Sequence, residues 1–247
     1  MNEAVTKAVI LAAGRGTRMG DLTLTLPKPM VEVRGKPVLS YILEGLRDAG
    51  LRQILIVVGY RKDVVMDHFG NGSALGLEIA YIEQIMQDGT GKVVELAKEF
   101  CGPDFFILSY GDILVDPSSY HLLTHPGDAD LILTVRHTDD PSKGGAVYLN
   151  EKFEVTDLRE KQRPGEASTP WYNAGVYTFK STIFSYVARL EKSPRGEYEL
   201  TDAVSAMARE GKKVKAVELK GNWADVGDPE TLSALNIRQP SPARQIR

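Results

Sequence analysis

The chain of 247 residues carries 30 Lys and Arg against 33 Asp and Glu, a net charge of −3 that argues against a general nucleic-acid binder. Its single cysteine, Cys101, excludes an intrachain disulfide and a cysteine-based metal site. No apolar run reaches the length of a membrane helix and no apolar leader opens the chain, so we expect a cytoplasmic protein without a membrane partner.

The first half of the chain alternates short apolar runs with amphipathic segments. This pattern predicts strands at residues 8–11, 30–33, 53–58, 77–84 and 104–109, and helices at 37–49, 62–69 and 92–100. A strand, a helix and a second strand in this order form a right-handed unit with parallel strands. Glycines and polar residues follow three of the strands, at the edge where open α/β sheets bind ligands.

The second half alternates apolar and polar residues in a spacing that is typical of hairpins. It predicts strands at residues 129–136, 145–149, 153–158, 171–179, 213–219 and 222–226, and helices at 181–190 and 200–209. Asp228 and Pro229 are expected to cap a last helix. Without a repeat or a low-complexity linker, residues 1–237 are expected to form one domain of halves 1–127 and 128–237, followed by a flexible tail at 238–247.

A loop of glycines and cations follows the first strand. Residues 12–20 contain three glycines, Arg15 and Arg18, and Lys28 follows between two prolines. Free backbone N–H groups and three cations on one stiff segment favour a polyanionic ligand such as a nucleoside triphosphate. The glycine spacing matches neither the dinucleotide fingerprint nor the Walker pattern, which argues against a hydride-transfer enzyme and a P-loop NTPase.

The same loop carries a family resemblance. Residues 11–19, Leu-Ala-Ala-Gly-Arg-Gly-Thr-Arg-Met, and the Pro-Lys-Pro at 27–29 resemble the signature of the sugar-1-phosphate nucleotidylyltransferases. These include glucose-1-phosphate thymidylyltransferases and the uridylyltransferases of glucose and N-acetylglucosamine 1-phosphate. The resemblance implies a Rossmann-like mixed, mostly parallel sheet flanked by helices, with a smaller antiparallel part. It assigns nucleotide binding to residues 1–127, sugar-phosphate binding to 128–237, and the nucleotide to Leu11, Ala12, Ala13, Gly14, Gly16, Thr17 and Arg18.

Two carboxylates are candidates for a metal site. Asp112 lies in Tyr-Gly-Asp after the predicted buried strand at 104–109, and Asp225 lies in Trp-Ala-Asp-Val-Gly. From the residues alone, Asp112 as a turn former and Asp225 as a residue near a helix start are equally good interpretations. The resemblance implies that both hold Mg²⁺. Asp116 is four residues beyond Asp112 rather than two, so the D-x-D of metal-dependent glycosyltransferases is absent.

The resemblance also points to nucleobase recognition by Gln84, Gly89 and Thr90. An amide can donate to and accept from a pyrimidine edge, and a glycine leaves room for the base. The Gln-Asp-Gly-Thr-Gly form at 87–91 is more similar to uridylyl- and thymidylyltransferases than to adenylyl- or guanylyltransferases. A threonine that caps a helix in a glycine turn has the same pattern.

The acceptor pocket of the family is similar to three segments of the second half. They supply Gly145, for which the adjacent Gly144 is an alternative, the pair Glu160 and Lys161, and Asn173 in Trp-Tyr-Asn-Ala-Gly. The resemblance implies that Glu160 accepts hydrogen bonds from sugar hydroxyls, that Asn173 binds the sugar, and that Lys161 binds the sugar phosphate. Taken singly, Lys161 is more often a solvated charge. Residues 195–202 resemble the same enzymes, or else start a helix with Thr201 as its cap.

These residues together predict a Mg²⁺-dependent transferase. An oxygen of a sugar 1-phosphate attacks the α-phosphorus of a nucleoside triphosphate, and pyrophosphate leaves. Arg15, Lys28 and Asp112 are the predicted catalytic residues. UTP or dTTP, with glucose 1-phosphate or N-acetylglucosamine 1-phosphate, are the favoured substrates.

Other interpretations stay open. The enzyme could use CTP or GTP with a heptose, inositol, mannose or muramic acid phosphate, or the fold could serve a non-catalytic sugar-nucleotide sensor. Intact Arg15, Lys28, Asp112 and Asp225 argue against a sensor. The chain ends soon after the Trp223 motif, so we expect no acetyltransferase domain. Homo-oligomerisation is also left open.

Overall fold

The computed structural model describes residues 4–237, and the tail expected at 238–247 lies outside the described residues. Four parallel strands form the centre of the first half: β1 (Lys7–Ala12), β4 (Gln53–Val58), β5 (Glu78–Glu83) and β6 (Phe106–Tyr110). Strand β1 lies between β4 and β6, and β5 lies on the outer side of β4. The predicted parallel units are therefore confirmed.

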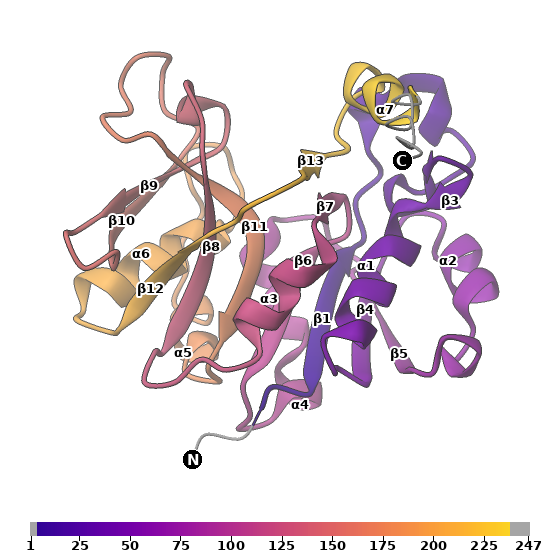
Figure 1. Ribbon diagram of the computed structural model, residues 1–247, viewed down its shortest axis with the longest axis horizontal. Coiled ribbons are helices and arrows are strands. Elements are labelled where there is room, and N and C mark those ends of the chain that lie inside the picture. The colour runs from indigo at the N-terminus through magenta and orange to yellow at the C-terminus, as the bar shows by residue number, and fades with distance from the viewer. Residues whose placement is uncertain (1–3, 238–247) are drawn as a thin grey trace, which may run out of the picture.

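Both faces of these strands are covered by helices (Figure 1). Helices α1 (Val38–Asp48) and α2 (Lys62–Phe69) pack on the face that contains Ala8 and Ile10 of β1. Helix α3 (Thr90–Leu96) packs on the other face, with Val9. Because successive side chains of a strand point to opposite faces, a run that is apolar throughout requires both layers.

The second half extends this sheet with strands that pair antiparallel, apart from the last of them, which runs parallel to its neighbour. It contains β8 (Leu131–His137), β9 (Gly145–Leu149), β10 (Val155–Glu160), β11 (Trp171–Phe179) and β12 (Val214–Glu218), with helices α5 (Ile183–Val187) and α6 (Leu200–Arg209). Within residues 4–237, nine strands form one sheet, ordered β10-β9-β11-β6-β1-β4-β5, with β8 against β11 and β12 against β8. The mixed α/β architecture agrees with the prediction.

Strand β11 belongs to both halves. Its end, from Val176 to Phe179, runs antiparallel to β6, and its start, Trp171 and Tyr172, pairs with β9. The register shifts between Asn173 and Tyr177, where Gly175 adopts a φ of 81°. The bulge turns the strand from one half toward the other.

A two-stranded ribbon connects the halves a second time. Strand β13 (Trp223–Asp225) pairs antiparallel with β7 (Ile113–Val115) and, in Figure 1, leads from the second half back to the first. It continues into α7 (Pro229–Asn236), which lies near β2 (Glu32–Val33) and β3 (Lys36–Pro37). Asp228 accepts a hydrogen bond from the Thr231 N–H at 2.8 Å, which confirms the predicted cap of α7.

Several predicted elements differ from the structure. The helix expected at 92–100 begins at Thr90, after Gly89 with its φ of 116°, and is divided into α3 and α4 (Lys98–Cys101). Helix α5 is shorter than expected because, past its end, the N–H groups of Arg189 and Leu190 bond three residues back. The N-cap residue of α6 is Glu199 rather than Thr201. The remaining described elements are short 3-10 helices: η1 (Thr17–Thr23), η2 (Lys28–Met30), η3 (Ser73–Leu75), η4 (Pro117–Leu123) and η5 (Pro141–Lys143).

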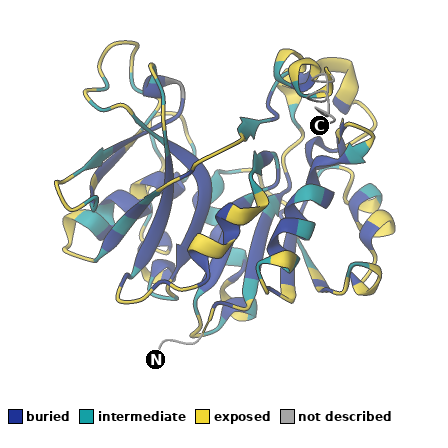
Figure 2. Cartoon of the chain, viewed as in Figure 1, coloured by how far each residue is buried: buried dark blue, intermediate teal, exposed yellow. Residues whose placement is uncertain are grey.

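Burial follows the layers. Figure 2 shows buried strands in the middle of the molecule and helices with exposed outer faces. Between residues 4 and 237, no helix is both long and apolar enough to cross a membrane.

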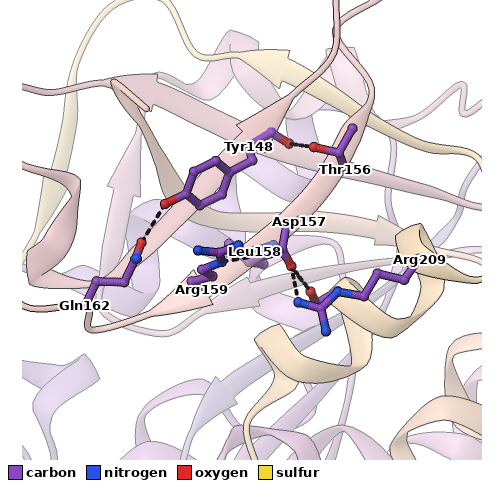
Figure 3. A network of polar contacts seen from close by, with 8 residues as sticks. Tyr148, Thr156, Asp157, Leu158, Arg159, Gln162 and Arg209 are labelled. Carbon is purple, nitrogen blue, oxygen red and sulfur yellow. Dashed lines mark hydrogen bonds and ion pairs between the residues drawn. The ribbon is translucent and has the colours of Figure 1, made fainter. Parts of the chain in front are cut away.

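A buried carboxylate attaches α6 to β10. Asp157 of β10 accepts hydrogen bonds from Ser205 and Arg209 of α6, the latter at 2.8 Å (Figure 3). Arg159 donates to its second oxygen at 2.8 Å. Burial opposes ionisation, but these donors outweigh it and lower the pKa of Asp157. The contact fixes α6 against the strand that ends at Glu160.

Candidate active site

A cleft of about 490 Å³ opens between the two halves, at the carboxyl ends of β1, β5 and β6. Its volume is within the range of small-molecule sites, about 300–1,000 Å³. Most of the predicted site residues line it: Leu11, Ala13, Gly14, Arg18, Gln84, Gly89, Thr90, Asp112, Gly145, Glu160, Lys161, Asn173 and Asp225. The fold thus brings residues from both ends of the sequence to one cavity.

The signature loop leaves β1 at Ala12 and passes along this cleft. Gly14 has open space on its side-chain side, so its backbone is free to approach a ligand. Gly16 adopts a φ of 71°, and a Cβ there would lie 2.8 Å from the Cβ of Lys28. Ala12, Gly16, Thr17 and Lys28 are not among the cleft-lining residues. Gly16 instead packs against the lysine.

Lys28 lies between the two predicted metal carboxylates. Its ammonium contacts Asp112 Oδ2 and is 3.5 Å from Asp225 Oδ1. The ribbon of β7 and β13 creates this proximity, because Asp225 pairs with Ile113 and the Val226 N–H donates to the Asp112 carbonyl at 2.9 Å. Only 8% of Lys28 is exposed. The charge cluster is built by segments far apart in the sequence.

The electrostatics of this cluster favour a cation. Burial, and next the charge of Asp112, raise the pKa of Asp225. Its buried Oδ1 has no hydrogen-bond partner among the described residues, although it lies in the ion pair with Lys28. Oxygen ligands suit a hard divalent cation, which commonly takes one or two carboxylates and completes its shell with substrate phosphates and water. Within residues 4–237 no group of three metal-ligating side chains occurs, and the Lys28 ammonium lies between the two aspartates.

The two arginines of the loop differ in position. Arg18 lines the cleft, and its positive charge acts on Asp225. Arg15 is exposed and does not line the cleft; its guanidinium carbon lies 5.1 Å from the ring centroid of Tyr60. The structure therefore does not bring Arg15 to the carboxylates, and its catalytic role stays a prediction.

The predicted nucleobase segment also connects the halves. Gln84 follows β5 and is 9% exposed. A Cβ on Gly89 would lie 2.5 Å from the backbone N and O of Tyr198, so the space beside this glycine is filled by protein. Thr90 Oγ1 accepts the Leu200 N–H of α6 at 3.1 Å. Sequence reasoning missed Gln87, which lines the cleft and donates to the Ala13 carbonyl at 3.2 Å.

Glu160 and Lys161 follow each other at the end of β10. Burial, and next the charge of Glu199, raise the pKa of Glu160. Lys161 adopts a φ of 41°, which is rare for a side-chain-bearing residue, and its N–H donates to the Gly144 carbonyl at 2.8 Å. Such backbone strain concentrates at functional sites. Gly144 and Gly145 both line the cleft, so either can face a ligand.

Asn173 lies at the bulge of β11 and is 8% exposed. Its amide oxygen accepts the Gly175 N–H at 3.2 Å, and its Nδ2 donates to the Tyr177 hydroxyl at 2.6 Å. The side chain is therefore held at both ends while it lines the cleft.

Aromatic residues next to the recognised motifs complete the cavity, although sequence analysis did not single them out. Tyr110, Tyr172 and Trp223 line it. The rings of Tyr172 and Trp223 meet edge to face at 5.9 Å. Burial, and next the charge of Asp225, raise the pKa of Tyr172 to about 12, so its hydroxyl is a donor at neutral pH. In the sequence, each of these aromatic residues lies within two positions of Asp112, Asn173 or Asp225, and this proximity could have identified them.

Asp116 lies outside this cleft. Its carboxylate accepts the Ser118 N–H at 3.0 Å and caps η4. This position agrees with the absence of a D-x-D metal motif.

Known proteins share this sequence pattern. Residues 7–239 match the family model described as nucleotidyl transferase. The chain is 36% identical over 229 residues to the bifunctional protein GlmU of Methanococcus aeolicus, covering 93% of this chain and 53% of that protein. It is 36% identical over 234 residues to a glucose-1-phosphate thymidylyltransferase of Streptomyces griseus, covering 93% and 65%. The chain thus spans about half to two thirds of the length of these curated relatives.

Solved structures share the fold. A Bacillus anthracis protein assigned as a glucose-1-phosphate thymidylyltransferase, in complex with sucrose, superimposes with a TM-score of 0.83 at 25% identity, over 93% of each chain. A UDP-glucose pyrophosphorylase with UDP-glucose gives 0.81 at 23% identity, over 94% of this chain and 97% of that one. With the match of residues 7–239, the chain belongs to the nucleotidyl transferase family.

Proposed function

We propose that this chain is a Mg²⁺-dependent sugar-1-phosphate nucleotidylyltransferase, which joins a nucleoside triphosphate to a sugar 1-phosphate and releases pyrophosphate. The observation that carries the proposal is the cluster of Lys28, Asp112 and Asp225, which lies where the two halves of the sheet meet. Transfer of a nucleotidyl group depends mainly on positioning and on neutralising charge, and this cluster supplies both.

Residues 1–127 bind the nucleotide in this proposal. The open backbone at Gly14 and the guanidinium of Arg18 receive the phosphates along the cleft. The amides of Gln84 and Gln87 lie on the same side, where they can read a uracil or thymine edge. UTP or dTTP is therefore the favoured nucleotide, and the Streptomyces griseus relative is described as a thymidylyltransferase.

Residues 128–237 bind the sugar 1-phosphate. Glu160 and Asn173 face the sugar hydroxyls, and Lys161 faces the phosphate. Glucose 1-phosphate or N-acetylglucosamine 1-phosphate is the favoured acceptor. Its phosphate oxygen is already anionic at neutral pH, so the attack needs no general base.

The chemical step forms one bond and breaks one. An oxygen of the sugar phosphate attacks the α-phosphorus in line, and the bond between the α-phosphorus and the bridging oxygen breaks as pyrophosphate leaves. Lys28 and Arg18 stabilise the negative charge that develops on the phosphates. Arg15 would contribute after leaving Tyr60. Asp112 and Asp225 would hold Mg²⁺, which would supply further charge neutralisation when bound.

The test is pyrophosphate release with Mg²⁺ from UTP, dTTP, CTP, GTP or ATP, each combined with a panel of sugar 1-phosphates. We expect release that depends on both substrates and is strongest with UTP or dTTP. Strongest release with CTP or GTP would keep the reaction and overturn the assigned nucleotide. No release with any pair, together with tight binding of a nucleotide sugar, would replace the proposal with a sensor.

A further inference from the structure

The orientation of the Asn173 amide is fixed by its two partners. A backbone N–H can only donate, so the group that faces Gly175 at 3.2 Å is the amide oxygen. The amide nitrogen then faces the Tyr177 hydroxyl at 2.6 Å, which accepts its proton. The rest of the amide, one N–H and one oxygen lone pair, is available to the cleft that Asn173 lines.

The side chain of Tyr177 is enclosed by the core. It is fully buried, and its ring stacks on Phe179 with centroids 5.2 Å apart. Its oxygen accepts from Asn173, so its own proton points elsewhere, and the Tyr110 hydroxyl lies 3.5 Å away. Burial raises the pKa of Tyr177, which keeps the hydroxyl protonated at neutral pH. The hydroxyl is thus a rigid acceptor for Asn173.

The contact between Asn173 and Tyr177 lies where β11 passes from one half of the sheet to the other. Asn173 and Tyr177 are four residues apart on β11, on either side of the register shift at Gly175. The bulge places a residue of the sugar half beside a tyrosine that pairs with β6 of the nucleotide half. A phenylalanine ring would fill the core equally well. A buried hydroxyl costs free energy unless it is hydrogen-bonded, so we infer that the Tyr177 hydroxyl serves its hydrogen bond rather than packing.

We propose that Tyr177 is a positioning residue for the acceptor substrate: its hydroxyl locks the Asn173 amide so that one N–H and one lone pair face two neighbouring hydroxyls of the sugar. The substrate part of this inference rests on the proposed function, while the locked amide does not. Tyr177 is fully buried and does not line the cleft, so it acts only through Asn173.

The first experiment observes the amide without any substrate. Nitrogen-15 NMR of the full chain gives the side-chain NH₂ signal of Asn173, assigned by its loss in Asn173→Asp. We expect Tyr177→Phe to shift or broaden this signal, because the amide loses its acceptor. Tyr120→Phe is the matched control, since Tyr120 is also buried but packs in the core layer on the other face of the sheet. An unchanged signal in Tyr177→Phe would overturn the inference.

The second experiment measures kinetics with the productive substrate pair. We expect Tyr177→Phe to raise KM for the sugar 1-phosphate about five- to tenfold, the scale of one hydrogen bond, and to leave KM for the nucleotide unchanged. Tyr120→Phe should change neither constant. A Tyr177→Phe variant with wild-type KM values would overturn the positioning role, while a wild-type protein without turnover would instead contradict the proposed function.

A double variant separates positioning from general damage. If Tyr177 acts through Asn173, adding Tyr177→Phe to Asn173→Ala should have no further effect on KM for the sugar phosphate. Equal effects of Tyr177→Phe in both backgrounds would show that the tyrosine acts on the core as a whole and would overturn the inference.

Discussion

At the scale of single residues, the proposed function depends on the ammonium of Lys28 beside Asp112 and Asp225. We expect Lys28→Met, which keeps most of the side-chain length, to lower turnover about a hundredfold or more, the effect of removing one charge-stabilising donor. The measurement is the steady-state rate of pyrophosphate release. Lys36→Met, which removes a half-exposed ion pair with Glu44, is the control and should have near-normal activity. Near-normal turnover of Lys28→Met would contradict the mechanism.

Glu160 connects the site to stability. Burial and the neighbouring Glu199 raise its pKa above the ordinary value of 4.5. When the pKa of a group is higher in the folded than in the unfolded protein, the group stabilises the fold at pH values below its unfolded pKa. This stabilisation is lost as the pH rises through the folded pKa. We therefore expect Glu160→Gln to raise Tm at pH 7 more than at pH 4, and to raise KM for the sugar phosphate.

The check is thermal unfolding of Glu160→Gln across this pH range. Glu218→Gln, at an exposed position of β12, is the control and should leave Tm nearly unchanged. A lower Tm for Glu160→Gln at pH 7 would show that the carboxylate is stabilised rather than strained in the fold.

Residue positions were predictable where a recognisable motif fixes them, while the roles of these residues stay predictions. The sequence placed Asp112 and Asp225 in one site because both follow recognisable motifs. It could not show that Arg15 lies against Tyr60, since the direction of a loop side chain depends on tertiary contacts. Nor could it show that Lys28 is 8% exposed between the two carboxylates.

At the scale of elements, the contact of α6 with β10 sets the shape of the sugar half. Asp157 on β10 accepts from Ser205 and Arg209 on α6 (Figure 3). The start of α6 and the end of β10 both line the cleft, through Thr201 and Glu160. A displaced α6 would therefore change the cleft.

We expect Asp157→Asn to destabilise the fold by about 1–3 kcal/mol at pH 7, the cost of an incompletely satisfied buried group. The lowered pKa of Asp157 gives stability above its ordinary value of 3.8 that is lost as pH falls through the folded value, so the difference in Tm should shrink in acid. Glu210→Gln breaks only an exposed ion pair with Arg189 and should change Tm far less. Equal effects of the two variants would contradict the role of Asp157.

The helices and strands that could be predicted are those whose apolar residues recur with a clear period. The buried strands β1 and β4 and the amphipathic α1 followed from apolar spacing. The three-residue β7 was missed because so short a segment has no period, although it brings Asp225 to Asp112. The division of the expected helix at 92–100 follows from the turn at Ala97, which no proline or glycine signals.

At the scale of the whole molecule, residues from both halves line one cleft. Strand β11 and the ribbon of β7 and β13 join the two halves. The glycine-rich loop predicted the edge of the sheet where the cleft lies, and the antiparallel pattern predicted a distinct second half. Two contacts were not predictable: that of Thr90 with Leu200, which joins the halves, and that of Asn173 with Tyr177, which lies across the bulge of β11. Both depend on the tertiary packing and on the bulge.

The central claim is that two phosphorylated substrates exchange a bond in this cleft. Phosphorus-31 NMR of the complete reaction with Mg²⁺ tests it most directly. We predict that the triphosphate and sugar-phosphate signals give way to equal amounts of a nucleoside diphosphate sugar and pyrophosphate, and only when both substrates are present. Release of inorganic phosphate, or of pyrophosphate without the sugar phosphate, would contradict the account.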